Sequence, residues 1–119
     1  MRVLLIEDDA ILRMILADEL GEEGIEVNGL ANAEDALILL GAGQVPDVLV
    51  TDISLGGGLS GFDLAELARA KHPEVAVILI SGTAPDPAQH PLRRREMFLA
   101  KPFLPSTLAA AIRKAGQKE

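Results

Sequence analysis

Apolar segments of the length of β-strands recur along the chain. Residues 3–6 are all apolar and are followed directly by acidic residues. Residues 48–50, 75–80 and 97–99 are similar short apolar segments. A strand that is apolar at every position must be covered on both faces, which is typical of the interior of a parallel sheet. Residues 24–31 carry a weaker pattern in which apolar and polar side chains alternate. This alternation predicts a strand with one face open to water, as at the edge of a sheet.

Helical patterns separate most of these strands. The first predicted helix places its apolar residues three and four positions apart, on one face: Ile11, Leu12, Ile15, Leu16 and Leu20. The second begins after an Asn32 cap and runs through Leu40, and the third covers residues 62–68. The last helix covers residues 108–115, with Pro105 in its first turn.

The stretch before the last strand breaks this regularity. Pro85, Pro87 and Pro91 all fall within residues 84–96. A proline inside a helix removes a backbone donor and costs roughly 3 kcal/mol, so no continuous helix can cross all of them. We expect at most a turn or two of helix beginning at Pro91, with Leu92 reaching the core.

Strand and helix alternate along the chain, which predicts an α/β fold with a parallel sheet, right-handed crossovers and helices on both faces. The 119 residues fit a single domain, 1–119, with no room for a second one. The net charge of −7 argues against a nucleic-acid partner, and no apolar stretch is long enough to span a membrane. The absence of cysteine excludes a thiolate metal site and a cysteine nucleophile, and it favours an intracellular location.

Residues that can carry chemistry follow the predicted strands. Glu7 and Asp8 come after the first strand and Asp52 after the third, while Ser81 and Lys101 end the fourth and fifth. The carboxyl ends of parallel strands meet at one edge of a sheet, and ligands bind there in open α/β folds. The sequence therefore predicts that these side chains share one site.

Three carboxylates at one place repel each other unless a cation joins them. A cluster with only oxygen ligands suits a hard divalent cation, above all Mg²⁺. Asp52 is then the natural nucleophile for a phosphoryl group, which Lys101 and Ser81 would contact. Each residue alone also has a purely structural interpretation. For Asp9 we prefer that interpretation, in which it complements the dipole of the following helix.

Taken together, these motifs resemble the receiver domains of bacterial two-component response regulators over essentially the whole chain. Residues 3–9 (VLLIEDD) resemble the first strand of that family with its acidic pair. Residues 47–55 (DVLVTDISL) resemble the strand that carries the phosphoacceptor. Residues 78–82 (ILISG) and 101–103 (KPF) resemble the Ser/Thr strand and the terminal Lys-Pro-Phe.

The resemblance implies a flavodoxin-like, CheY-like fold: five parallel strands in the order 2-1-3-4-5, with helices on both faces and the helix before strand five short or disordered. It implies a stand-alone receiver over residues 1–119 without an output domain. A histidine kinase or a histidine phosphotransfer protein would phosphorylate it in the cytoplasm, and it would signal to a downstream protein, with no nucleic acid or membrane as partner. It would be no enzyme beyond autocatalysed phosphoryl acceptance and slow autodephosphorylation.

The resemblance also assigns roles to individual residues. These are the phosphoacceptor Asp52, the Mg²⁺ ligands Glu7, Asp8, Asp52 and Ser54, and the phosphoryl-contacting or switch residues Ser81, Lys101 and Phe98. Glu7 would act through water and Ser54 through its backbone carbonyl. The peptide bond between Lys101 and Pro102 would be cis, as bonds to proline can be.

The sequence departs from the family at the turn after Leu55, where residues 56–58 are all glycine and we expect a flexible turn. Three other functions are alternatives to a phosphorylated receiver. A Mg²⁺-dependent aspartyl-phosphate phosphohydrolase typically has a second Asp where Ser54 stands. A flavodoxin-like cofactor binder would find its phosphate repelled by the acids after strand one. A receiver that has lost phosphorylation would not need the complete set of acid, hydroxyl and lysine.

Overall fold

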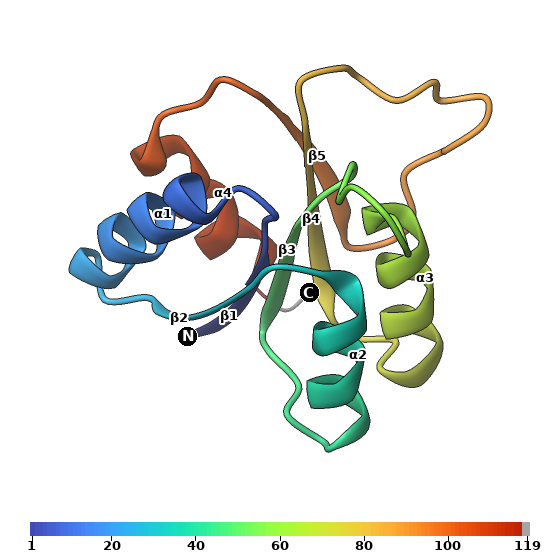
Figure 1. The fold of residues 1–119 in the computed structure, drawn as a ribbon, viewed down its shortest axis with the longest axis horizontal. Helices are drawn as coiled ribbons and strands as arrows, with labels where there is room; N and C mark the ends of the chain where they lie inside the picture. The colour runs from blue at the N-terminus through green and yellow to red at the C-terminus, as the bar shows by residue number, and fades with distance from the viewer. Residues whose placement is uncertain (118–119) are drawn as a thin grey trace.

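A five-stranded parallel sheet in the order β2-β1-β3-β4-β5 forms the centre of the computed structural model, which describes residues 1–117 (Figure 1). The elements are β1 (Arg2–Ile6), α1 (Ala10–Glu22), β2 (Glu26–Leu30), α2 (Ala33–Gly41), β3 (Val48–Asp52), α3 (Gly61–Lys71), β4 (Ala76–Ser81), β5 (Glu96–Ala100) and α4 (Pro105–Ala115). The predicted fold class and strand order are both confirmed.

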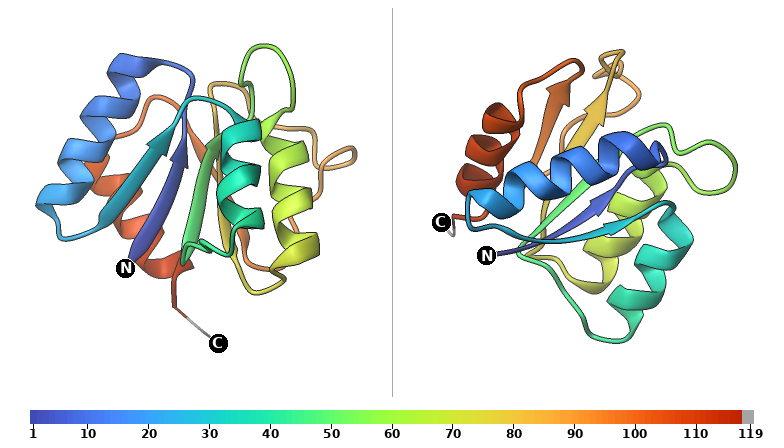
Figure 2. Two further views of the ribbon diagram at one scale, coloured as in Figure 1. Left: turned by 60° about the horizontal axis from the view of Figure 1, so that its bottom comes forward. Right: turned by 60° about the vertical axis from the view of Figure 1, so that its left-hand side comes forward.

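Helices cover both faces of the sheet, as expected (Figure 2). On one face α1 and α4 enclose a core to which β3 contributes Val48 and Val50. On the other face α2 and α3 enclose a second core, which contains Leu49. Because neighbouring residues of a strand point to opposite faces, a strand between two cores is largely apolar. All five residues of β3 are buried: residues 48–50 carry the predicted apolar pattern, and Thr51 and Asp52 follow them as buried polar residues.

The first helix buries less of its apolar surface than its sequence pattern predicts. Leu16 and Leu20 are buried in the core, but Ile11 and Ile15 are 68% and 45% exposed. The single face predicted for all of them is therefore wrong. Each isoleucine precedes a core-facing residue by one position, which turns it about 100° around the helix axis and away from the sheet. Asp9 has the structural role that we preferred: its Oδ1 accepts hydrogen bonds from the N–H groups of Ile11 (3.0 Å) and Leu12 (3.1 Å).

No helix lies between β4 and β5 in the described chain, as the prolines predict. The connection forms a wide arch instead, drawn in yellow and orange in Figure 1. The expected helical turn at Pro91 is absent, and Leu92 is 55% exposed instead of reaching the core. The arch is attached to α3 by His90, whose ring stacks on Phe62 with a centroid distance of 3.9 Å. The stacking of His90 on Phe62 thus provides the contact with the rest of the fold that we predicted for Leu92.

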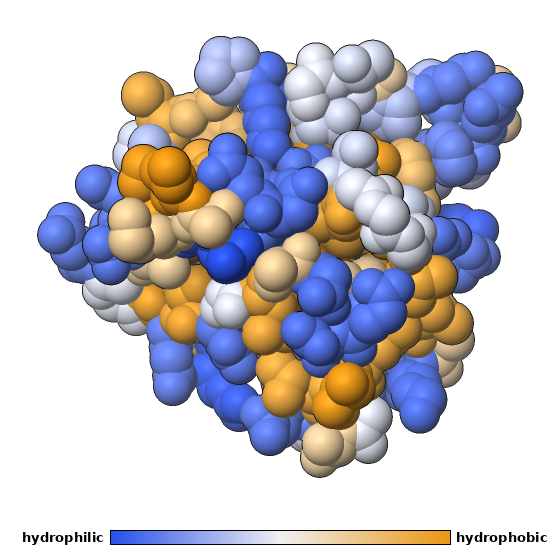
Figure 3. All heavy atoms as spheres, in the orientation of Figure 1, coloured by the Kyte–Doolittle hydropathy of each residue, from blue (hydrophilic) through white to orange (hydrophobic). Residues whose placement is uncertain are grey.

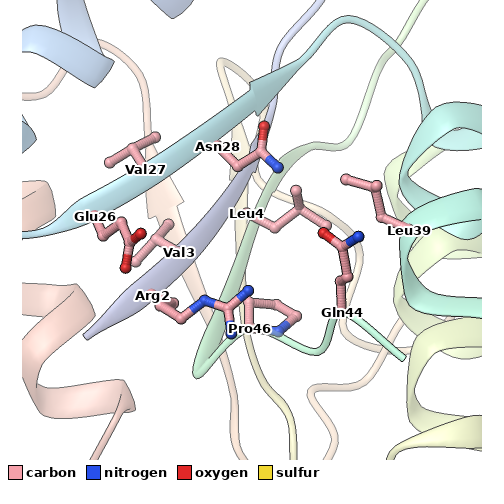
Figure 4. A pocket seen from close by; sticks show the side chains of 9 residues that line it. All are labelled: Arg2, Val3, Leu4, Glu26, Val27, Asn28, Leu39, Gln44 and Pro46. Atoms are coloured by element: carbon pink, nitrogen blue, oxygen red, sulfur yellow. The ribbon is translucent and has the colours of Figure 1, made fainter. Parts of the chain in front are cut away.

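The edge strand β2 is open to water on one face, as its alternating sequence predicts. Val27 packs against the core, whereas Glu26 and Asn28 are exposed. A cavity of about 270 Å³ lies beside them, between the starts of β1 and β2 and the chain after α2 (Figure 4). None of the residues predicted to bind the cation or the phosphoryl group lines this cavity. None of the helices in the described part of the chain is long and apolar enough to cross a bilayer.

Candidate functional site

Three carboxylates meet at the carboxyl ends of β1 and β3. Glu7, Asp8 and Asp52 each place a carboxylate oxygen within 4.8 Å of the others. The register explains this arrangement, because β1 and β3 are neighbours and Ile6 pairs with Thr51. The next residues along the two strands, Glu7 and Asp52, therefore lie side by side at this edge of the sheet. The structure brings together the acidic residues that the sequence predicted to converge.

Lys101, which directly follows β5, binds two of these carboxylates. Its Nζ donates to Asp52 Oδ2 at 2.6 Å and to Glu7 Oε1 at 2.9 Å. The Lys101 backbone N–H is bound to the carbonyl of Ser81 (2.9 Å), which fixes where its side chain starts. The peptide bond to Pro102 is cis, and this expectation is confirmed.

The electrostatics of the site are dominated by the burial of Glu7, which is 3% exposed. Burial raises the pKa of Glu7 from 4.5 to about 7, and Asp52 adds to the rise, whereas Lys101 opposes it. For Lys101, burial alone would lower the pKa. The hydrogen bonds to Asp52 and Glu7 more than offset this effect, so the pKa of Lys101 is raised. Lys101 is therefore firmly cationic, whereas Glu7 can titrate near neutral pH.

This arrangement predicts a pH-dependent stability for the metal-free protein. The native state holds the Glu7 proton more tightly than the unfolded chain does. The resulting stabilisation is fully present below pH 4.5, the pKa of Glu7 in the unfolded chain. It is lost as the pH rises through about 7, its pKa in the folded protein. We expect the free energy of unfolding, measured by urea denaturation in EDTA, to fall by about 3 kcal/mol over this window because of Glu7. Glu7→Gln should remove the decline, and Glu19→Gln, at an exposed acid of α1, should leave it unchanged. An unchanged decline in Glu7→Gln would contradict the assignment.

Asp52 is the last residue of β3 and is 8% exposed. Its Oδ1 accepts the Ser54 N–H at 3.1 Å, and Oδ2 accepts from Lys101, so both carboxylate oxygens are fixed. Gly61 packs directly against the Asp52 carbonyl: a Cβ at Gly61 would lie only 2.2 Å from that oxygen. A side chain at Gly61 would therefore displace the backbone that carries Asp52.

The two remaining predicted residues stand apart from the carboxylates. Ser81 ends β4 at the same edge of the sheet, and its Oγ accepts the Thr83 N–H at 3.1 Å. Phe98 is half-buried within β5 and packs against the core beneath α2 and α3. The structure thus places Ser81 at the same sheet edge as the site and Phe98 at the boundary of the second core.

Sequence reasoning missed two residues that support the site. Arg13 Nη1 donates to the Glu7 carbonyl at 2.5 Å, which fixes the backbone after β1. Glu34 Oε2 accepts the Leu59 N–H at 3.0 Å and so reaches from α2 to the turn after β3. Arg13 could have been noticed as the one basic residue in α1, whereas nothing in the sequence pattern marks Glu34.

The oxygen ligands of this cluster suit a hard cation that keeps some of its coordination positions for water or a phosphate oxygen. Glu7 Oε2 is buried without a hydrogen-bond partner in the described chain, which is costly unless something binds there. The Asp8 carboxylate is exposed and forms no hydrogen bond or ion pair with the described residues. Carboxylate oxygens are the preferred ligands of Mg²⁺, which usually keeps several waters. The cluster can therefore bind such a cation and still admit a phosphate oxygen.

Comparisons with known proteins agree with this geometry. Residues 3–113 match the family model described as "Response regulator receiver domain". The transcriptional regulatory protein PdtaR of Mycobacterium tuberculosis is 33% identical over 112 residues, which cover 93% of this chain and 54% of that protein. The sensor kinase CckA of Brucella abortus is 31% identical over 120 residues, which cover 98% of this chain and 13% of CckA. The chain spans about half of PdtaR and a small part of CckA.

Solved structures show the same architecture. A response regulator receiver protein from Sinorhizobium medicae WSM419 is similar with a TM-score of 0.88 and 27% identity, covering 97% of this chain and 93% of that one. The receiver domain of the hybrid histidine kinase CckA has a TM-score of 0.83 and 30% identity, covering 98% of this chain and 100% of that domain.

Proposed function

Because this chain belongs to the response regulator receiver domain family, we propose that it accepts a phosphoryl group on Asp52 in a Mg²⁺-dependent reaction. One observation carries the proposal: the Asp52 carboxylate is paired with Lys101 (2.6 Å) and also belongs to an acidic cluster that fits a divalent cation. Phosphoryl transfer consists mostly of positioning and charge neutralisation. The fixed Asp52 carboxylate would supply the first, and Lys101 together with a cation would supply the second.

In the proposed reaction, an Asp52 carboxylate oxygen attacks the phosphorus of a phosphohistidine. A P–O bond forms, the P–N bond breaks, and the imidazole leaves with the electron pair and takes up a proton. Lys101 neutralises one phosphoryl oxygen, and the Ser81 hydroxyl turns from the Thr83 N–H to contact another. Glu7, Asp8, Asp52 and the Ser54 carbonyl are the residues that would hold the cation. Bound Mg²⁺ supplies positive charge to the phosphoryl oxygens.

Exposed apolar residues beside the site support a protein as the phosphoryl donor. Ile11 (68% exposed) and Met14 (59%) lie in the first turns of α1, directly after the acids. Leu104 is 69% exposed at the start of α4, which packs beside α1. Figure 3 shows hydrophobic spheres over this end of the molecule, at the upper left. Such a patch suits a docking partner.

We therefore propose a histidine kinase or histidine phosphotransfer protein as the donor, acting in the cytoplasm, and a downstream protein as the target of the signal. The net charge of −7 disfavours nucleic acid in either role. Turnover as a phosphohydrolase is disfavoured because Ser54 stands where a second Asp would be needed. Beyond accepting the phosphoryl group, the protein would only slowly remove it by autodephosphorylation.

The proposal is tested by incubating the protein with a small acyl phosphate or phosphoramidate, with either Mg²⁺ or EDTA. We expect intact-mass spectrometry to show one added phosphoryl group per chain with Mg²⁺ and little or none with EDTA. The adduct should be cleaved by hydroxylamine, as an acyl phosphate is. Equal labelling in EDTA, or an adduct that resists hydroxylamine, would contradict the proposal.

A further inference from the structure

The turn between β3 and α3 contains three consecutive glycines, Gly56, Gly57 and Gly58, next to the acidic cluster. Gly56 and Gly58 have φ angles of 80° and 84°, a left-handed conformation that glycine adopts at little cost. Glycine also loses more backbone freedom on folding than any other residue. A turn of this composition is held in one position only if its surroundings fix it.

This turn forms one side of the site at Asp8. A Cβ built on Gly56 would lie 3.8 Å from Asp8 Oδ2, so the backbone of the turn passes close to that carboxylate. Asp8 itself is exposed and forms no hydrogen bond or ion pair with the described residues. The space around its carboxylate therefore depends on where the turn lies.

The near end of the turn is fixed by β3 and the core. Leu55 is buried, and the Ser54 N–H is bound to Asp52 Oδ1. The far end is fixed from α2: Glu34 Oε2 accepts the Leu59 N–H at 3.0 Å. The same oxygen also lies against Gly58, where a Cβ would be only 2.8 Å away. Glu34 thus bonds to Leu59 and lies close to Gly58 at the far end of the turn.

We propose that Glu34 is a positioning residue of the site, which anchors the glycine turn at Leu59 and thereby sets the space around Asp8 for the cation. This inference rests on the proposed Mg²⁺-dependent function, because it assigns Glu34 a task in that same site. Glu34 acts through the turn and does not touch the reacting atoms. A glutamine at this position has the same length and keeps an acceptor oxygen, so it should also anchor the turn.

A purely helical role for Glu34 makes a different prediction. Glu34 and Asp35 both lie in the first turn of α2, where an acid complements the helix dipole. Asp35 offers the same charge at the same helix end, but its side chain forms no hydrogen bond or ion pair with the described residues of the turn. Asp35→Ala is therefore the matched control for Glu34→Ala.

The experiment first measures amide hydrogen exchange of residue 59 by NMR in the metal-free protein. We expect exchange about tenfold faster in Glu34→Ala, where the acceptor is lost, and near the wild-type rate in Glu34→Gln and Asp35→Ala. Mg²⁺ affinity, followed by chemical-shift titration, should fall about three- to tenfold in Glu34→Ala and change less than twofold in the other two variants.

Unchanged exchange at residue 59 in Glu34→Ala would overturn the anchor. Faster exchange with unchanged Mg²⁺ affinity would overturn the positioning role, as would equal loss of affinity in Glu34→Ala and Asp35→Ala. Failure of the proposed function looks different, because the wild-type protein itself would then bind no Mg²⁺ or take up no phosphoryl group. In that case the inference falls with it, whatever the exchange rates show.

Discussion

Asp52→Asn is expected to abolish phosphoryl incorporation, with labelling at least about a hundredfold below that of the wild type. An amide keeps the size of the side chain but is a poor nucleophile towards phosphorus. The fold should survive, because Lys101 keeps its bond to Glu7 (2.9 Å). Intact-mass spectrometry after incubation with a small phosphodonor and Mg²⁺ measures the effect directly.

Asp9→Asn is the matched control for this experiment. It makes the same chemical change beside the site, but Asp9 caps α1 and stands outside the carboxylate cluster. Asparagine caps helices about as well as aspartate, so both stability and labelling should stay near the wild-type values. Labelling that persists in Asp52→Asn would place the nucleophile on another residue, which peptide mapping would then identify.

Much of the fold could be predicted because its determinants are local. A strand buried on both faces is largely apolar, and a proline excludes a helix wherever it would fall beyond the first turn. The convergence of Glu7, Asp8 and Asp52 was predictable for a related reason, since these acids stand at the ends of strands that a parallel sheet brings together. Strand order, which decides that β1 lies beside β3, came from the family resemblance and not from periodicity.

The features that the sequence did not predict depend on contacts between distant segments. Glu34 bonds to a residue 25 positions away, and no periodic pattern records such a pair. The stacking of His90 on Phe62 likewise depends on the path of an irregular loop. Ile11 and Ile15 are exposed because of the rotation of α1 about its own axis relative to the sheet. The apolar stripe of this helix is so broad that the sequence is compatible with more than one such rotation.

Asp8→Asn should separate two effects of the acidic cluster. Lys101 is bonded to Glu7 and Asp52 but not to Asp8, so Asp8 adds negative charge that no described cation neutralises. Removing that charge relieves repulsion in the metal-free protein, and we expect its melting temperature to rise by about 2–4 °C in EDTA. The same change removes a proposed ligand, so Mg²⁺ affinity should fall about tenfold or more.

The two effects have opposite signs, which makes the result specific to this cluster. Wild-type protein should gain thermal stability when Mg²⁺ is added, and Asp8→Asn should gain much less at the same concentration. Asp9→Asn again provides the control, because it removes one negative charge without touching the cluster, and it should keep the wild-type response. A full Mg²⁺ response in Asp8→Asn would show that the cation binds elsewhere. A lower melting temperature in EDTA would show that Asp8 stabilises the metal-free fold, so that repulsion among the carboxylates is not what limits its stability.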